Sequence, residues 1–218
     1  MQFLINRLID HTLLKPYATE KEVIKLCEEA KKYNFFSVCV FPIYVSLCKK
    51  LLKDTNIKVT TVISFPFGAS TVATKCFETK EAIKNGADEI DMVMNITAFK
   101  SKNYKFVLDE IKSVREITKG KILKIIIETA YLTKEEKIKA AQIVKEAEAD
   151  FIKTSTGFTS TGATVKDVKI IKSVVGNHLG IKAAGGIRSL KEAIALINAG
   201  ATRIGTSASL DIIKQLYN

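Results

Sequence analysis

The sequence is short of metal ligands and has no long apolar run. It contains two histidines, His11 and His178, with neither an H-x-x-x-H pair nor a Cys/His cluster, so a zinc-assisted mechanism lacks its usual ligands. No segment approaches the roughly 18 uninterrupted apolar residues of a membrane span, and residues 1–15 lack the charge, apolar core and cleavage site of a secretion signal. We therefore expect a cytoplasmic protein with no bound metal and no membrane contact.

Motifs for disulfide frames and nucleotide cofactors are also missing. The four cysteines form no C-x-x-C pair, and three lie in apolar-periodic contexts, which indicates free reduced thiols. The glycines form neither G-x-G-x-x-G nor G-x-x-x-x-G-K-S/T, so nothing predicts binding of a dinucleotide or of ATP. We expect no cofactor.

Arginine is scarce although the chain is basic. The formal net charge is +11, from 34 lysines and arginines against 23 acids, but only four of the basic residues are arginines. The lysines are interspersed with acids, as in residues 133–148, which is typical of a solvated lysine-rich surface. We therefore expect no nucleic-acid partner, and the charge favours an anionic substrate.

Short apolar segments alternate with amphipathic helical patterns. The apolar segments resemble parallel strands covered by helices and span residues 8–14, 35–41, 57–65, 88–94, 122–128, 150–154, 179–184 and 202–206. Helical patterns span residues 19–34, 71–86, 103–118, 133–149, 164–176, 189–200 and 209–217. Eight such units favour a single (β/α)8 TIM barrel over an open doubly wound sheet. We predict one domain over residues 1–218 with a short N-terminal helical extension, although the length would also permit two small domains.

Several of these helices have a capping-box start, in which a hydroxyl residue precedes an acid by three positions. The pairs are Thr19 with Glu22, Thr133 with Glu136, Ser189 with Glu192 and, more loosely, Thr164 with Asp167.

Active sites of such barrels lie where the strands end, so polar residues late in a strand are the candidates. They are Asp10, Asp91, Glu128, Lys153 and Lys182. Lys153 and Lys182 come from consecutive units, so adjacent strands would present them side by side. Burial and repulsion between two ammonium groups both lower a lysine pKa, and a neutral amine can attack a carbonyl to form a Schiff base. The alternative is that one lysine only pairs with Asp91 or Glu128.

Asp91 is a carboxylate within the apolar segment DEIDMV. Alone it would indicate a hydrogen-bonded structural residue, but beside two lysines it could shuttle protons as a general acid and base. Glu128 and Asp10 could support it, and the spacing does not rank them.

Glycine-rich loops follow the late strands, in STGF, AAGGIRS and IGTSAS. Free backbone amides at these loops suit a phosphate, and (β/α)8 barrels commonly bind phosphate after the seventh and eighth strands.

The motifs together resemble one family along nearly the whole chain. IDHTLLKPYAT, VISFPFGAS, GADEIDMVMNI, DFIKTSTGF and GIKAAGGIRS are similar to the deoxyribose-phosphate aldolases, which are class I aldolases with a (β/α)8 barrel. The resemblance implies reversible cleavage of 2-deoxy-D-ribose 5-phosphate to D-glyceraldehyde 3-phosphate and acetaldehyde, in deoxyribonucleoside and carbohydrate catabolism.

The resemblance also implies roles for single residues. Lys153 is the expected Schiff-base lysine, Lys182 the second lysine that tunes it, and Asp91 the proton donor and acceptor. The expected phosphate contacts are Gly157, Gly185, Gly186, Gly205 and Ser207. Some family members have a lysine where this chain has Phe158, and Arg188 is a candidate to compensate for that charge.

Two other functions stay open at this stage. One is a transaldolase-like barrel enzyme acting on ketose phosphates. The other is a nucleic-acid-binding protein that uses the +11 charge. For the aldolase we expect a phosphorylated aldehyde as substrate and consider a homodimer.

Overall fold

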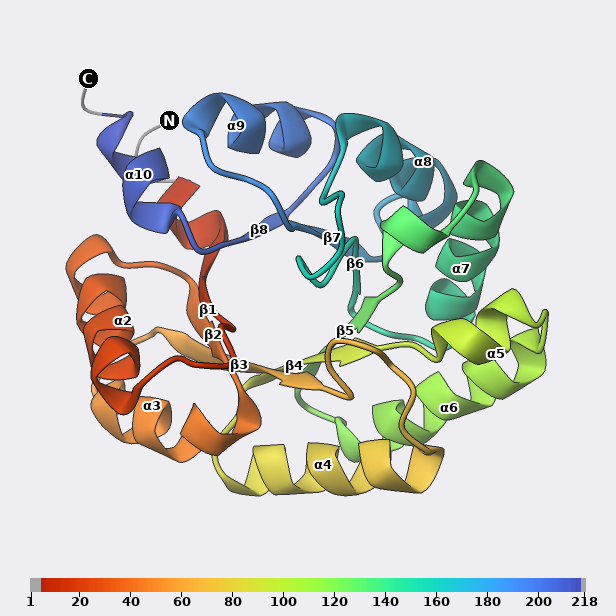
Figure 1. The fold of residues 1–218 in the computed structure, drawn as a ribbon, viewed down its shortest axis with the longest axis horizontal. Helices are drawn as coiled ribbons and strands as arrows, with labels where there is room; N and C mark the ends of the chain where they lie inside the picture. The colour runs from red at the N-terminus through yellow and green to blue at the C-terminus, as the bar shows by residue number, and fades with distance from the viewer. Residues whose placement is uncertain (1–4, 217–218) are drawn as a thin grey trace.

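The computed structural model describes residues 5–216 and contains a closed barrel of eight parallel strands (Figure 1). Each strand pairs with its neighbour in chain order, and β1 pairs with β8 to close the ring. The strands are β1 (Ile9–Leu13), β2 (Ser37–Val40), β3 (Lys58–Ile63), β4 (Glu89–Val93), β5 (Ile122–Ile126), β6 (Phe151–Lys153), β7 (Gly180–Ala184) and β8 (Arg203–Thr206). The predicted (β/α)8 barrel is therefore confirmed.

Helices surround the ring of strands on its outer side (Figure 1). They are α2 (Glu20–Tyr33), α3 (Val45–Leu51), α4 (Val72–Lys84), α5 (Ile96–Lys100), α6 (Tyr104–Ile117), α7 (Lys134–Glu146), α8 (Val165–Val175), α9 (Leu190–Asn198) and α10 (Ser209–Lys214), with 3-10 turns η1 (Asn6–Leu8), η2 (Pro42–Tyr44) and η3 (Thr129–Tyr131). The sequence did not predict α3 and α5, because helices of seven and five residues are too short to show a helical period. Of the predicted N-terminal extension, η1 is described, and residues 1–4 lie outside the described residues.

The predicted helix starts are correct. Thr19, Thr133 and Ser189 each form a reciprocal capping box with the acid three residues later. Thr164 makes only the forward contact, in which its side chain accepts from the backbone N–H of Asp167. These bonds satisfy N–H groups that an uncapped helix would leave free.

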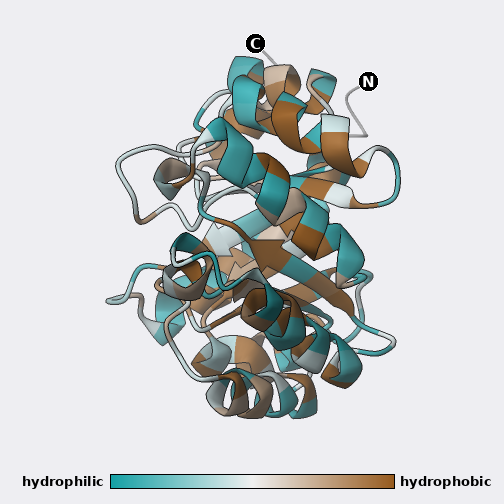
Figure 2. Ribbon diagram, turned by 90° about the vertical axis from the view of Figure 1, so that its right-hand side faces the viewer, coloured by the Kyte–Doolittle hydropathy of each residue, from teal (hydrophilic) through white to brown (hydrophobic). Residues whose placement is uncertain are grey.

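The apolar core lies between the strands and the helices. The apolar face of α2, with Val23, Leu26, Cys27 and Ala30, is buried against the strands. Figure 2 shows hydrophobic segments in the strands and both colours along the helices, as expected for amphipathic helices that cover a barrel. All four cysteines are free, as predicted. Within residues 5–216, no helix is long and apolar enough to cross a membrane.

A buried ion pair outside the barrel fixes the end of β4. Lys75 Nζ on α4 lies 2.8 Å from Glu110 Oε1 on α6, and both side chains are fully buried. Lys75 also donates to the carbonyl oxygen of Val93 at 2.9 Å, while Glu110 accepts from the backbone N–H of Asn95 at 2.9 Å. Burial lowers the pKa of Lys75 and raises the pKa of Glu110, against the effect of the partner's charge. The pair therefore fixes the backbone of Val93 and Asn95, which follow Asp91 at the end of β4.

We expect Lys75→Met to lower the free energy of unfolding by about 3–5 kcal/mol, because it leaves the Glu110 carboxylate buried without its cation. Urea denaturation at neutral pH measures the loss. The matched control is Lys105→Met on α6, whose lysine is 84% exposed in its pair with Asp109 and should change stability by less than about 1 kcal/mol. Equal losses in the two variants would contradict a special role for the buried pair.

Candidate active site

A pocket of about 350 Å³ opens at the carboxyl ends of the strands, between the loops that follow β1, β6, β7 and β8. This is the end of the barrel at which active sites are expected, and the volume suits a small ligand. The pocket is lined by Lys153 and by all five predicted phosphate contacts, namely Gly157, Gly185, Gly186, Gly205 and Ser207. Asp91 and Lys182 are fully buried, directly beneath Lys153.

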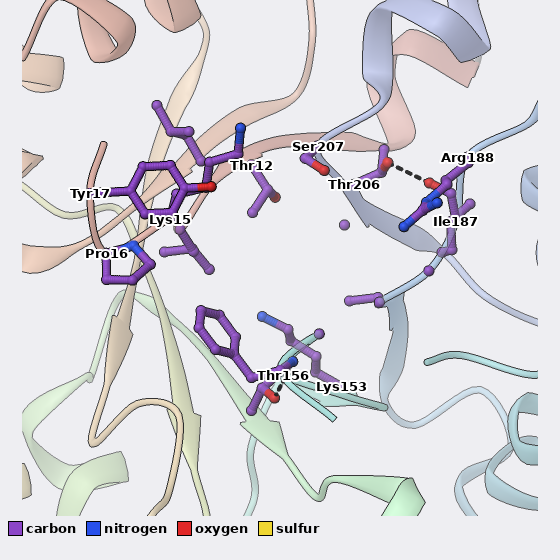
Figure 3. A pocket seen from close by; sticks show the side chains of 18 residues that line it. Thr12, Lys15, Pro16, Tyr17, Lys153, Thr156, Ile187, Arg188, Thr206 and Ser207 are labelled. Atoms are coloured by element: carbon purple, nitrogen blue, oxygen red, sulfur yellow. Dashed lines mark hydrogen bonds between the residues drawn. The ribbon is translucent and has the colours of Figure 1, made fainter. Parts of the chain in front are cut away.

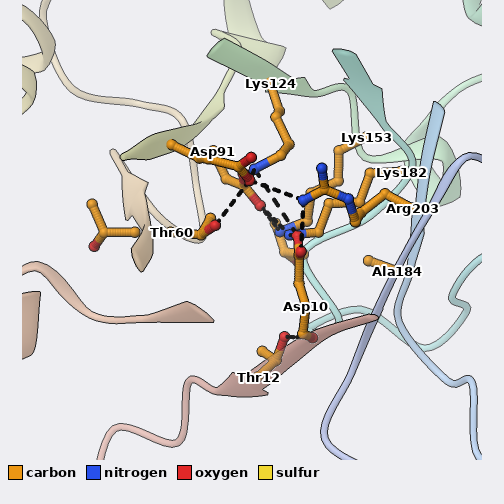
Figure 4. A network of polar contacts seen from close by, with 12 residues as sticks. Asp10, Thr12, Thr60, Asp91, Lys124, Lys153, Lys182, Ala184 and Arg203 are labelled. Carbon is orange, nitrogen blue, oxygen red and sulfur yellow. Dashed lines mark hydrogen bonds and ion pairs between the residues drawn. The ribbon is translucent and has the colours of Figure 1, made fainter. Parts of the chain in front are cut away.

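The structure brings the three predicted catalytic residues together (Figure 4). Asp91 Oδ2 accepts from Lys153 Nζ at 2.9 Å and from Lys182 Nζ at 2.7 Å. Lys153 and Lys182 are direct partners in the β6–β7 register, as their positions in consecutive units predicted. Lys153 is 2% exposed and lines the pocket, whereas Lys182 does not, so of these two amines a bound molecule can reach that of Lys153.

Three charged residues beneath this group were not predicted. Lys124 Nζ on β5 lies 2.8 Å from Asp91 Oδ1 and 2.6 Å from Glu89 Oε2. Arg203 Nη1 on β8 lies 2.8 Å from Asp10 Oδ1 and 3.0 Å from Glu89 Oε2.

The criterion of polar residues late in a strand excluded Glu89 and Arg203, because each begins its strand. It did not select Lys124 either, although Lys124 holds the same middle position in β5 as Asp91 does in β4 and is its register partner. The period of two in a strand was the available signal, since Glu89 must face the same side as Asp91.

Asp10 was a candidate without an assigned role. It lies on β1, where its Oδ2 is 2.5 Å from Lys182 Nζ, and its Oδ1 accepts from the Ser37 hydroxyl at 2.7 Å. Lys182 therefore pairs with two carboxylates, Asp10 and Asp91. This explains how a lysine can be fully buried in the barrel.

Burial and repulsion between two ammonium groups, which were expected to lower a lysine pKa, do not decide the pKa of Lys182. Burial opposes its ammonium form, but Asp10 and Asp91 outweigh burial and raise the pKa of Lys182. Burial likewise opposes the ionised form of Asp91, yet Lys124, Lys153 and Lys182 hold the pKa of Asp91 well below its ordinary value. Lys182 is thus a charged neighbour of Lys153, and Asp91 is a carboxylate.

Glu128 shapes the loop after β6 and does not pair with a lysine among the described residues. Its carboxylate accepts from the backbone N–H of Thr156 at 3.1 Å and from the Thr156 hydroxyl. The alternative that a lysine pairs with Glu128 is therefore wrong, whereas pairing with Asp91 is present for both lysines.

The glycines let two loops meet at the pocket. A Cβ on Gly162 would lie 2.0 Å from the carbonyl oxygen of Gly185, which also accepts from the N–H of Ala163 at 3.0 Å. Gly185 and Gly186 both have positive φ, at 87° and 75°, which favours glycine. A Cβ on Gly205 would lie 2.9 Å from Lys182 Cε, so this glycine also makes room for the lysine.

The mouth of the pocket combines two cations with aromatic rings. Lys15 and Arg188 lie on opposite sides of it (Figure 3). Phe158 lines the pocket, is 49% exposed and packs edge-on against Phe65, with ring centroids 5.2 Å apart. The sequence did not single out Lys15, which follows β1 in LLKPY.

Comparisons with known proteins agree with this site. The sequence model described as "DeoC/LacD family aldolase" matches residues 5–215. The chain is 54% identical over 214 residues to a deoxyribose-phosphate aldolase of Thermoanaerobacter sp. (strain X514), covering 97% of this chain and 96% of that protein. It is 53% identical over 210 residues to one of Enterococcus faecalis (strain ATCC 700802 / V583), covering 96% of each.

A solved structure is similar to this chain in fold along its whole length. The tetrameric deoxyribose phosphate aldolase of Aeropyrum pernix superposes with a TM-score of 0.93 at 30% sequence identity, covering 100% of this chain and 93% of that one. Matches of this length and identity leave one conclusion, that the chain belongs to the DeoC/LacD aldolase family.

Proposed function

We propose that the protein is a class I aldolase that cleaves 2-deoxy-D-ribose 5-phosphate reversibly to D-glyceraldehyde 3-phosphate and acetaldehyde. The observation that carries this proposal is the Lys153 amine at the floor of the pocket, 2.9 Å from a buried carboxylate and beside a second lysine. A reachable amine with proton carriers next to it is what Schiff-base chemistry on an aldehyde requires.

The reaction would begin with attack of the neutral Lys153 amine on C1 of the open-chain sugar. Loss of water gives an iminium, which withdraws electrons from the C2–C3 bond. Removal of the proton from the C3 hydroxyl breaks that bond and releases D-glyceraldehyde 3-phosphate, leaving a two-carbon enamine on Lys153. Protonation of the enamine at C2 and hydrolysis by water release acetaldehyde and regenerate the amine.

Asp91 and Lys182 would carry the protons of these steps. Lys182 Nζ lies 2.7 Å from Asp91 Oδ2, so a proton can pass between the two side chains without diffusion of either group. The raised pKa of Lys182 and the lowered pKa of Asp91 make the resting pair an ammonium, which holds a proton, and a carboxylate, which can accept one and serves as its counter-ion.

The substrate phosphate would bind to the loops after β6, β7 and β8. Gly157, Gly185, Gly186, Gly205 and Ser207 line this side of the pocket, and Arg188 adds a positive charge. Phe158 contributes no charge, so Arg188 and Lys15 are the cations available at the mouth.

Acetaldehyde release from 2-deoxy-D-ribose 5-phosphate, measured beside ketose phosphates, tests the proposed function. We expect cleavage of the deoxy sugar and none of the ketoses, because a two-carbon aldehyde enamine has no counterpart in ketose cleavage. Cleavage of ketoses alone would favour the transaldolase-like alternative. Salt-sensitive DNA binding without any lyase activity would favour a nucleic-acid-binding protein.

Assembly and location belong to the same proposal. The relative from Aeropyrum pernix is tetrameric, and we propose a homodimer for this chain, which light scattering in solution would test. The proposed location is the cytoplasm.

A further inference from the structure

The interior of the barrel contains unequal numbers of buried cations and anions. Among residues 5–216, the side chains joined by ion pairs there are three carboxylates, Asp10, Glu89 and Asp91, and four cations, Lys124, Lys153, Lys182 and Arg203, each 5% exposed or less (Figure 4). Fully ionised, the group has one positive charge in excess. A buried unpaired charge is costly, so one of the four cations is favoured to lose its proton.

The remaining polar groups around this cluster do not change the balance. Ser37 on β2 and Thr60 on β3 contribute hydroxyls, and burial raises the pKa of the Cys39 thiol, which stays neutral. Glu128 is a further buried carboxylate, after the end of β5, but in residues 5–216 it forms no ion pair with the four cations and accepts its hydrogen bonds from Thr156 and Thr159. Lys15 and Arg188 lie at the exposed mouth of the pocket, where water screens them.

The contacts identify the cation that is held least firmly. Lys124 contacts both Glu89 and Asp91, and Lys182 contacts both Asp10 and Asp91. Lys153 contacts a single carboxylate oxygen, Asp91 Oδ2, and shares it with Lys182. An arginine does not deprotonate in proteins, so Arg203 keeps its charge.

Two aromatic rings hold Arg203 in a position where its guanidinium pairs with the buried carboxylates of Asp10 and Glu89. Its guanidinium carbon lies 3.5 Å from the centroid of the Phe36 ring and 5.3 Å from that of Phe151. Its Nη1 donates to both Asp10 and Glu89. The carboxylates that would otherwise balance the lysines are thereby shared with a permanent cation.

We propose that Arg203 is a positioning residue for the aldol reaction: by pairing with Asp10 and Glu89 it leaves the barrel one carboxylate short, so that Lys153 gives up its proton and becomes the nucleophile. The inference rests on the proposed function. Arg203 does not line the pocket and acts through the charge balance of the buried group.

The pH dependence of kcat/KM distinguishes this role from a structural one. Arg203→Met leaves three lysines with three carboxylates, so every lysine can stay protonated. We expect the acid limb of the pH profile to move up by roughly one to two pH units, with activity near neutral pH falling about tenfold to a hundredfold and recovering in alkali. Glu89→Gln increases the excess of cations, so the acid limb should move down in pH.

The double variant Arg203→Met/Glu89→Gln restores one excess cation and provides the control. We expect its acid limb to return to within about half a pH unit of wild type, although each single change removes buried contacts. Circular dichroism establishes that each variant is folded, and Glu89→Gln tests the account even where Arg203→Met does not fold.

The outcomes separate this inference from the proposed function. Wild-type protein without lyase activity would overturn both. An active wild type whose variants keep the same acid limb, or a double variant that is displaced further than Arg203→Met, would overturn the role of Arg203 alone.

Discussion

Lys153→Met is expected to lower kcat/KM for cleavage of 2-deoxy-D-ribose 5-phosphate by about 10⁴-fold or more, the scale on which removal of a covalent nucleophile acts. Methionine nearly matches the length of the lysine side chain but cannot form a Schiff base. Lys182 cannot replace it, because it lies beneath the pocket and Asp10 and Asp91 raise its pKa. A coupled assay of acetaldehyde release measures the loss.

The fold should survive the Lys153→Met change. Lys153 makes one ion pair within the buried group, and Asp91 keeps its contacts with Lys124 and Lys182. Lys58→Met is the matched control, because Lys58 is exposed and begins β3, at the opposite end of the barrel from the pocket. We expect that variant to retain its activity. A folded Lys153→Met protein with comparable turnover would contradict the proposed mechanism.

Asp91→Asn is expected to reduce both activity and stability. The amide cannot accept and return a proton, which should cost about 10²- to 10⁴-fold in kcat. It also leaves Lys124, Lys153 and Lys182 without their shared carboxylate, which should lower the free energy of unfolding by about 3–5 kcal/mol near neutral pH. Urea denaturation and the lyase assay measure the two effects separately.

The stability difference between wild type and Asp91→Asn should depend on pH. The pKa of Asp91 is lowered in the folded state, so its stabilisation is fully present above the ordinary value of 3.8 and is lost as the pH falls through the folded value. The two proteins should therefore differ most near neutral pH and converge in strong acid. Equal stability near neutral pH would show that Asp91 is not the counter-ion of Lys124 and Lys182.

The local elements of the fold were predictable because their signals are local. The Thr19, Thr133 and Ser189 caps each depend on residues three apart, and the strands are short apolar runs. The boundaries were less accurate, since β6 covers only Phe151–Lys153 of the predicted 150–154. Helices α3 and α5 contain too few turns to show a period.

The buried charges were harder to predict because they depend on register. The adjacency of Lys153 and Lys182 follows from consecutive strands, and the prediction was correct. That Arg203 meets Glu89 and Asp10 depends on how eight strands close into a ring, which strand order alone does not define. The sequence indicated burial and repulsion, which lower a lysine pKa, but it did not show that Asp10 and Asp91 both contact Lys182 and raise its pKa.

The most direct test of the central claim is reduction of the wild-type enzyme with borohydride during turnover of 2-deoxy-D-ribose 5-phosphate, followed by peptide mapping. The account predicts an ethyl group on Lys153, within residues 150–158, because reduction captures the two-carbon imine left after cleavage. Without substrate, no such modification should form. An active enzyme that is not modified on Lys153, or that is modified on Lys182 instead, would contradict the account.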